Sequence, residues 1–89
     1  MKKQNDLNLF IMRHGESEGN IDHLNYPKVG DANINLTPLG WEQAFRGGEF
    51  MDAYLAQNNL GDLQRVWNSS LMRTEQTKTG LLMGYNRAI

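Results

Sequence analysis

Two short apolar segments that alternate with two helical segments constrain the fold of this 89-residue chain most. Residues 7–12 form an apolar run before a glycine-bearing turn, which predicts a buried strand, and residues 64–68 predict a second strand. Residues 37–58, and a segment from about 70 to 83, predict helices. This order is typical of a parallel α/β sheet. Because two strands are too few to stabilise such a sheet, the sequence predicts the first part of a larger α/β domain.

The first helix has clear start signals. Thr37 is a suitable N-cap, and Pro38 suits the first helical position. Apolar residues then recur at helical spacing on one face: Trp41, Ala44, Phe45, Met51 and Leu55. Gly40, Gly47 and Gly48 each weaken this helix by up to about 1 kcal/mol relative to alanine. We expect them to allow close packing against a sheet.

Composition excludes several classes of protein. The chain has no cysteine, so disulfide scaffolds, thiol nucleophiles and cysteine-based zinc sites are excluded. Nine basic and ten acidic residues give a net charge of -1, which argues against nucleic-acid binding through a basic surface. The apolar run Leu9–Met12 is too short for a signal-peptide core or a membrane span. The sequence therefore predicts a cytoplasmic protein with no membrane or nucleic-acid partner.

A polar loop rich in glycine, asparagine and aspartate follows the first predicted strand, over residues 15–36. Long loops of this kind in compact domains are usually functional or disordered. Arg13, His14 and Gly15 stand where the strand ends, and α/β sheets bind ligands beyond the carboxyl ends of their strands. Arg13 offers a fork of donors suited to phosphate, and His14 offers an imidazole that is nucleophilic when neutral. Gly15 permits a tight turn after the histidine.

A second polar segment begins at Ser69, just after the second predicted strand, so we expect it at the same sheet edge as His14. Ser69 suits the N-cap of the last helix. Arg73 lies on the first turn, where positive charge is unfavourable for the helix and a bound phosphate would compensate for it. Ser17 and Asn20 add short polar donors. By residue type, these segments predict a phosphate pocket with a histidine beside two arginines.

Three ordered segments resemble a known family. Arg13-His14-Gly15-Glu16-Ser17, with Asn20, resembles the signature of the histidine phosphatase superfamily, in its phosphoglycerate-mutase-like branch. Residues 36–44 resemble that family's block Leu-Thr-x-x-Gly-x-x-Gln-Ala, and residues 66–77 resemble Val-Tyr-Ser-Ser-Pro-Leu-x-Arg-Ala-x-Gln-Thr. The third block departs at Asn68, Ser70 and Thr74, and none of these matches a catalytic position.

The resemblance implies a three-layer α/β/α sandwich with a mostly parallel sheet. It also implies a role for each matching residue. His14 matches the nucleophile that becomes a phosphohistidine, and Arg13 and Arg73 match the arginines that hold the phosphoryl group. Positions near the phosphate or substrate are matched by Gly15, Ser17 and Asn20. Neither a metal nor another cofactor is implied, and no spacing among His14, Asp22, His23 and Asp31 fits a metal-ligand pattern.

The family also uses a second histidine in a later His-Gly motif and a downstream acid that protonates the leaving oxygen. Neither late motif is in this sequence. We expect His23 to be a solvated loop histidine rather than a substitute. Residues 1–89 are therefore expected to be the N-terminal portion of a histidine phosphatase domain, which is inactive without the rest.

Three functional hypotheses stay open. The first is a phosphatase that acts on a small phosphomonoester, because Lys28 is the only cation in residues 21–35 and leaves no strong site for a large polyanion. The second is a phosphomutase of the phosphoglycerate-mutase type. The third is a non-catalytic module that binds phosphate or assembles with a partner, for which a homo-oligomer would cover exposed sheet edges and apolar faces.

Overall fold

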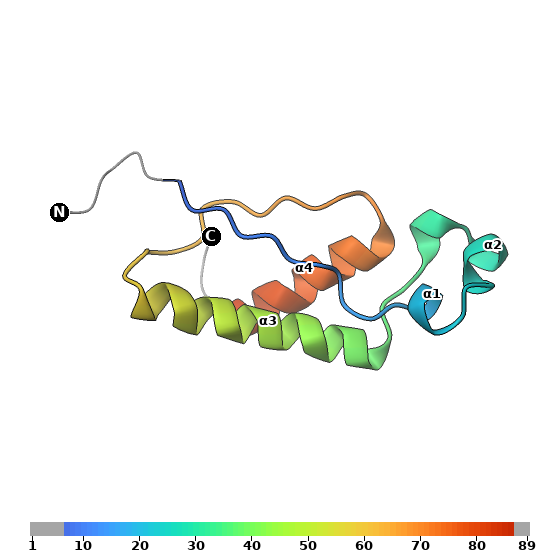
Figure 1. Cartoon of the computed structure of the whole chain (residues 1–89), viewed down its shortest axis with the longest axis horizontal. Coiled ribbons are helices and arrows are strands. Elements are labelled where there is room, and N and C mark those ends of the chain that lie inside the picture. The colour runs from blue at the N-terminus through green and yellow to red at the C-terminus, as the bar shows by residue number, and fades with distance from the viewer. Residues whose placement is uncertain (1–6, 87–89) are drawn as a thin grey trace.

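The computed structural model describes residues 7–86 and is built around two long helices (Figure 1). Helix α3 spans Pro38–Gln57 and helix α4 spans Met72–Tyr85. They lie side by side and run in the same direction, while residues 58–71 return alongside them. Over the described residues, no helix is both long and apolar enough to cross a membrane.

Three short helical segments gather at the end where α3 and α4 begin (Figure 1). They are α1 (Glu18–Ile21), α2 (Asn25–Val29) and the 3-10 helix η1 (Asp31–Asn33). The prediction of one continuous loop over residues 15–36 was therefore wrong in its detail. Its polar residues form single helical turns, and η1 packs against α4.

Glycines let α3 and α4 approach backbone to backbone. A Cβ atom on Gly48 would overlap the Leu81 carbonyl group, and one on Gly84 would overlap the Phe45 carbonyl group. Among the predicted glycines of α3, Gly48 thus permits close packing, but against a helix rather than the predicted sheet. Ala44 is buried in this interface as its spacing predicts. The side chain of Phe45 is exposed instead, because its backbone faces α4.

The start of α3 is as predicted, and the start of α4 is not. The Thr37 hydroxyl accepts a hydrogen bond from the Gly40 N–H at 3.1 Å, and Pro38 is the first helical residue. Helix α4 begins at Met72 with Leu71 at its N-cap, so the predicted cap by Ser69 was wrong. The Ser69 hydroxyl instead lies 2.9 Å from the Thr74 hydroxyl.

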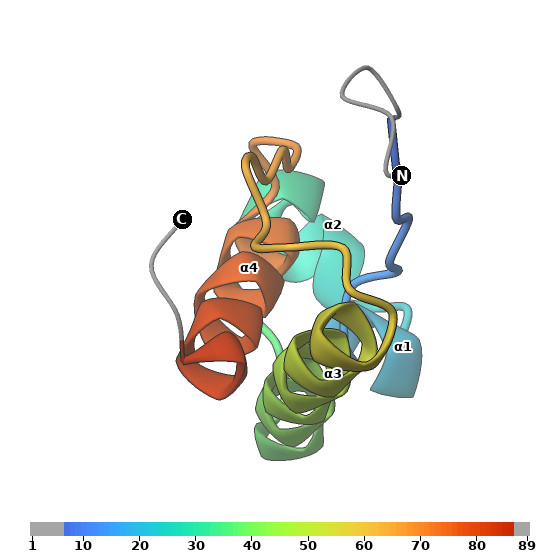
Figure 2. The same ribbon diagram turned by 90° about the vertical axis from the view of Figure 1, so that its left-hand side faces the viewer.

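The predicted parallel sheet does not form within residues 7–86. The two predicted strands, residues 7–12 and 64–68, are extended and run in the same direction on one side of the helix pair (Figures 1 and 2). A cavity lined by residues of both segments lies between them. No backbone hydrogen bond among residues 7–86 joins the two segments, so they do not pair as strands. The only ladder-type pairing in the described part is an isolated antiparallel bridge between Ser17 and Leu36.

The first extended segment is covered on one face only. The Phe10 ring stands edge-on to Tyr54 of α3 at a centroid distance of 5.7 Å. Leu7, Leu9 and Ile11 point the other way and are 87%, 66% and 90% exposed. The prediction of a buried strand was therefore wrong for this structure, because the helix pair forms a single covering layer.

Candidate functional site

The loop that carries His14 is held between the two long helices. The Gly15 N–H donates to the Thr77 hydroxyl of α4 at 3.1 Å. On the other side, Gly15 meets the first turn of α3, where an added Cβ would overlap the Gly40 carbonyl group. The tight turn predicted at Gly15 is therefore also a close contact between backbones, and a larger residue would push the loop away from α3.

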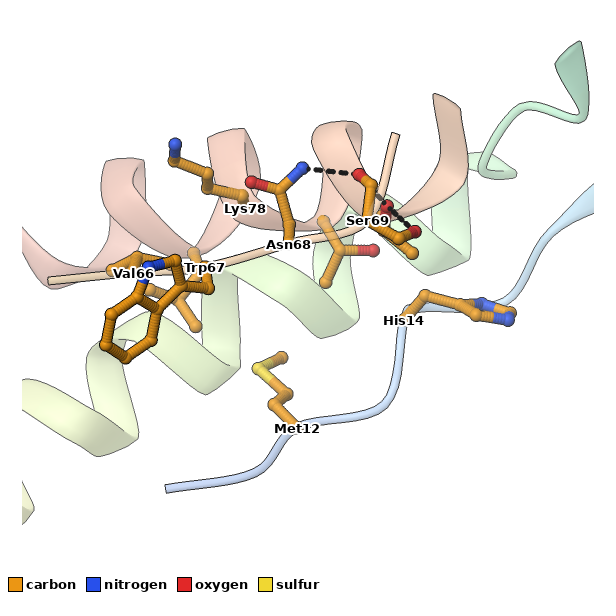
Figure 3. Close-up of a pocket in the computed structure, with 10 residues that line it drawn as sticks. Met12, His14, Val66, Trp67, Asn68, Ser69 and Lys78 are labelled. Atoms are coloured by element: carbon orange, nitrogen blue, oxygen red, sulfur yellow. Dashed lines mark hydrogen bonds between the residues drawn. The ribbon is translucent and has the colours of Figure 1, made fainter. Parts of the chain in front are cut away.

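The hydrogen bond of the His14 ring indicates which ring nitrogen carries the proton. The half-buried imidazole lies with Nδ1 2.7 Å from the Gly15 carbonyl oxygen. Because a carbonyl oxygen only accepts, Nδ1 carries the proton of this hydrogen bond. In the neutral ring the lone pair then belongs to Nε2. Figure 3 shows the ring at the end of the cavity, pointing away from Trp67.

Arg73 is a buried cation on the first turn of α4. Its side chain is 10% exposed, and both terminal nitrogens donate to Asp31 of η1. The Nη1 atom lies 2.7 Å from the Asp31 carbonyl oxygen, and Nη2 lies 3.1 Å from the carboxylate. Asp31 therefore offsets the positive charge that is unfavourable at a helix N-terminus, a function that the sequence analysis assigned to phosphate alone.

Thr77 links the histidine loop to the arginine turn. Its buried hydroxyl donates to the Arg73 carbonyl oxygen at 2.6 Å and accepts from the Gly15 N–H. Two hydrogen bonds thus join the backbone beside His14 to the backbone of Arg73. Gln76, the residue before Thr77, accepts from the Leu36 N–H at 2.8 Å and so binds the end of the same polar region to α4.

A cavity of about 270 Å³ joins the two predicted halves of the site (Figure 3). His14 and Met12 line it from the first segment, and Ser69 and Thr74 line it from the second. Residues that follow both predicted strands thus line one cavity, but no sheet edge brings them together, and neither Arg13 nor Arg73 lines it. Lys78 adds a cation to the lining that the sequence analysis did not predict.

Ser17, Asn20 and Arg13, the other predicted site residues, do not line this cavity. The Ser17 N–H and hydroxyl both donate to the Asn20 carbonyl-type side-chain oxygen, at 2.9 and 3.0 Å, and these bonds begin α1. A contact of Ser17 or Asn20 with phosphate stays a prediction. Arg13 is exposed beside His14, and no ion pair in the described part of the chain involves it. His23 lies exposed between α1 and α2.

Residues 7–86 contain no group of three histidine, cysteine or acidic side chains placed to hold a metal ion.

The sequence analysis missed Asp31, Gln76 and Thr77 as parts of the site. Thr77 stands four residues after Arg73, on the same helix face, and this spacing is a signal that could have found it. Asp31 is 42 residues from Arg73 along the chain, and no local pattern indicates such a contact.

Comparison with known proteins identifies the family. Residues 9–87 match the histidine phosphatase superfamily (branch 1), and the chain belongs to this family. It is 38% identical to phosphoglycerate mutase 2 of Saccharomyces cerevisiae over 73 residues. It is 34% identical over 91 residues to the phosphoglycerate mutase-like protein AT74H of Arabidopsis thaliana. It is also 32% identical over 71 residues to the phosphohistidine phosphatase SixA homolog of Haemophilus influenzae.

The chain spans only part of these relatives. The three matches cover 82%, 97% and 80% of this chain, but 22%, 32% and 39% of the respective relatives. No solved structure matches the chain at comparable significance.

Proposed function

We propose that this chain carries the phosphoryl-accepting part of a histidine phosphatase, with His14 as the nucleophile and Arg13 and Arg73 as the phosphoryl clamp. One observation carries the proposal: Thr77 bonds the backbone beside His14 to the backbone of Arg73. These two hydrogen bonds tie the loop that carries His14 to the helix turn that carries the buried Arg73. Membership of the histidine phosphatase superfamily supports this assignment.

In the proposed reaction, Nε2 of His14 attacks the phosphorus of a small phosphomonoester. The bond from phosphorus to the leaving oxygen breaks as the new nitrogen–phosphorus bond forms, and the leaving oxygen takes up a proton. The arginines neutralise the equatorial oxygens, since phosphoryl transfer needs positioning and charge stabilisation above all. Water then breaks the nitrogen–phosphorus bond, which restores His14 and releases inorganic phosphate. Gly15, Ser17 and Asn20 shape the phosphate side of this site.

The proposal assigns the 89 residues to the N-terminal portion of a three-layer α/β/α domain. Residues 7–12 and 64–68 would be strands of its parallel sheet, and their shared direction supports that arrangement. The chain alone would lack turnover, because a second histidine and the proton donor are not among the residues assigned here. We further propose a cytoplasmic enzyme that uses no metal and takes a small phosphorylated substrate.

Phosphorylation of the chain by phosphoramidate, a small chemical donor to imidazole, tests the proposal. We expect an acid-labile increase of one phosphoryl group in intact mass, mapped to His14 by peptide sequencing. His14→Ala abolishes it, whereas the control His23→Ala retains it. Arg73→Met slows the reaction by about 10- to 100-fold through loss of a charged donor. Labelling that persists in His14→Ala contradicts the proposal.

A phosphomutase is the second candidate, and identity to phosphoglycerate mutase 2 favours it. The two activities differ in the fate of the phosphohistidine. A phosphatase admits water to it, whereas a mutase excludes water and returns the phosphoryl group to an acceptor. Release of inorganic phosphate by the longer protein, without added acceptor, distinguishes the phosphatase. Phosphate binding with no phosphohistidine would instead indicate the non-catalytic module.

A further inference from the structure

The donors that Arg73 would offer to phosphate are already engaged by Asp31. Both terminal guanidinium nitrogens point to this residue, one to its backbone carbonyl oxygen and one to its carboxylate. The contact joins η1 to the first turn of α4. Since a guanidinium presents its donors in a fixed fork, the edge that faces Asp31 cannot bind a second anion in the same geometry.

We propose that Asp31 is a displaceable internal counter-ion that competes with phosphate for Arg73. The inference rests on the proposed function, because it takes Arg73 as a phosphate ligand. The Asp31 carboxylate supplies one negative charge to a cation that is buried on α4. A phosphate group carries about 1.5 to 2 negative charges near neutral pH and three acceptor oxygens, so it binds the same fork more strongly than a carboxylate does.

The surroundings of Asp31 favour its release. Its side chain is 62% exposed, although its partner Arg73 is only 10% exposed, so the freed carboxylate would move directly into water. Release costs little on the Asp31 side, because water solvates an exposed carboxylate well, and a bound phosphate would compensate the buried guanidinium. The segment is also short: η1 has three residues and follows Gly30, whose positive φ of 84° is a backbone conformation suited to glycine.

Asp31 could affect phosphate binding in two ways, by competing for Arg73 or by positioning it, and one variant can distinguish them. The reason is that Arg73 donates both to the Asp31 carboxylate and to the Asp31 backbone carbonyl oxygen. Asp31→Asn removes the carboxylate charge and keeps an acceptor of the same size. The carbonyl oxygen that accepts from Nη1 at 2.7 Å stays in place. A loss of competition therefore raises phosphate affinity, whereas a loss of positioning lowers it. The sign of the change distinguishes the two roles.

Titration of the wild-type chain and its Asp31→Asn variant with inorganic phosphate tests the inference, followed by amide chemical shifts of Gly15 and the first turn of α4. We expect Kd for phosphate to fall by about 2- to 5-fold in Asp31→Asn, the range that a partly exposed ion pair supports. Asp31→Glu keeps the charge and should bind close to the wild type.

Asp22→Asn is the matched control, because Asp22 is an exposed acidic residue of the same polar region whose carboxylate accepts a local bond from the Leu24 N–H. It removes the same charge without touching Arg73, and we expect its Kd to change by less than about twofold. Unchanged or weaker phosphate binding in Asp31→Asn, with clear binding by the wild type, would overturn the inference and leave the proposed function intact. If neither protein binds phosphate, the proposed function and this inference both fail.

Discussion

Helices α3 and α4 bury the face by which they meet, whereas residues 7–12 and 64–68 leave apolar side chains in solvent. The difference follows from where each element finds its hydrogen bonds. A helix satisfies most of its backbone groups internally, so a pair of helices needs only side-chain and close backbone contact. An extended segment depends on a neighbouring strand. The chain thus forms its helical layer and its histidine loop from its own residues, whereas its extended segments find no strand partner within residues 7–86.

Replacing Gly48 should have the largest effect on the helical layer. The added methyl group of Gly48→Ala would overlap the Leu81 carbonyl group, so α3 and α4 must separate. We expect the free energy of unfolding in urea to fall by about 2 kcal/mol. The neighbouring Gly47→Ala is the control, because its methyl group meets only the flexible end of Met12. That variant should change stability by less than about 1 kcal/mol. Equal losses in the two variants would contradict the packing described.

Removing the Thr77 hydroxyl should release the histidine loop. Thr77→Val leaves the buried Gly15 N–H and Arg73 carbonyl group without this partner, and we expect a loss of about 1.5 kcal/mol in unfolding free energy. Phosphorylation of His14 should slow in parallel, and Thr77→Ser should restore both. Thr79→Val is the control, since the Thr79 hydroxyl makes only an exposed bond to the Glu75 carbonyl oxygen. A Thr77→Val variant that keeps full stability and reactivity would show that this link is dispensable.

Loss of the α3 cap should have an intermediate effect. The Thr37 hydroxyl accepts from the Gly40 N–H and donates to the Glu16 carboxylate at 2.8 Å, so it joins α3 to the histidine loop. We expect Thr37→Ala to lower the thermal midpoint, with a cost of about 1 kcal/mol, and Thr37→Ser to recover most of it. An unchanged midpoint in Thr37→Ala would mean that the cap contributes nothing.

Substitution on the outer face of the first extended segment should have the smallest effect. Ile11 is 90% exposed, and we expect Ile11→Ser to change the free energy of unfolding by less than about 0.5 kcal/mol. A buried strand would instead lose several times that amount. Urea denaturation of Ile11→Ser beside the wild type decides between them, and a large loss would show that this face is covered in solution.

Local signals predicted the parts of the fold that depend on local interactions. The Thr37 cap and the proline after it specify the start of α3, and these are contacts between near neighbours. The predicted strands are extended but form no sheet within residues 7–86. Strand pairing depends on other segments, and an apolar run such as residues 7–12 does not indicate its partner. Ser69 is not the cap of α4 because the helix begins two residues later than predicted, with Leu71 at the N-cap. There the Thr74 hydroxyl donates to the Leu71 carbonyl oxygen.

The candidate site divides in the same way. His14, Gly15 and Arg73 could be predicted as site residues because each belongs to a contiguous motif, and their roles stay predictions. Asp31 was not found, since its contact with Arg73 exists only once η1 lies against α4. Thr77 is an intermediate case. Its position on the same helix face as Arg73 could be predicted from the spacing, but its hydrogen bond with Gly15 spans 62 residues of sequence.

Amide hydrogen exchange measured residue by residue tests most directly whether the histidine loop belongs to the helical layer. The account predicts that the Gly15, Leu36 and Thr37 amides exchange slowly, with those of α3 and α4, because each donates to a fixed partner. Amides of residues 8–12 and 65–68 should exchange fast, since no hydrogen bond within residues 7–86 engages their N–H groups. Fast exchange at Gly15, or slow exchange along both extended segments, would contradict it.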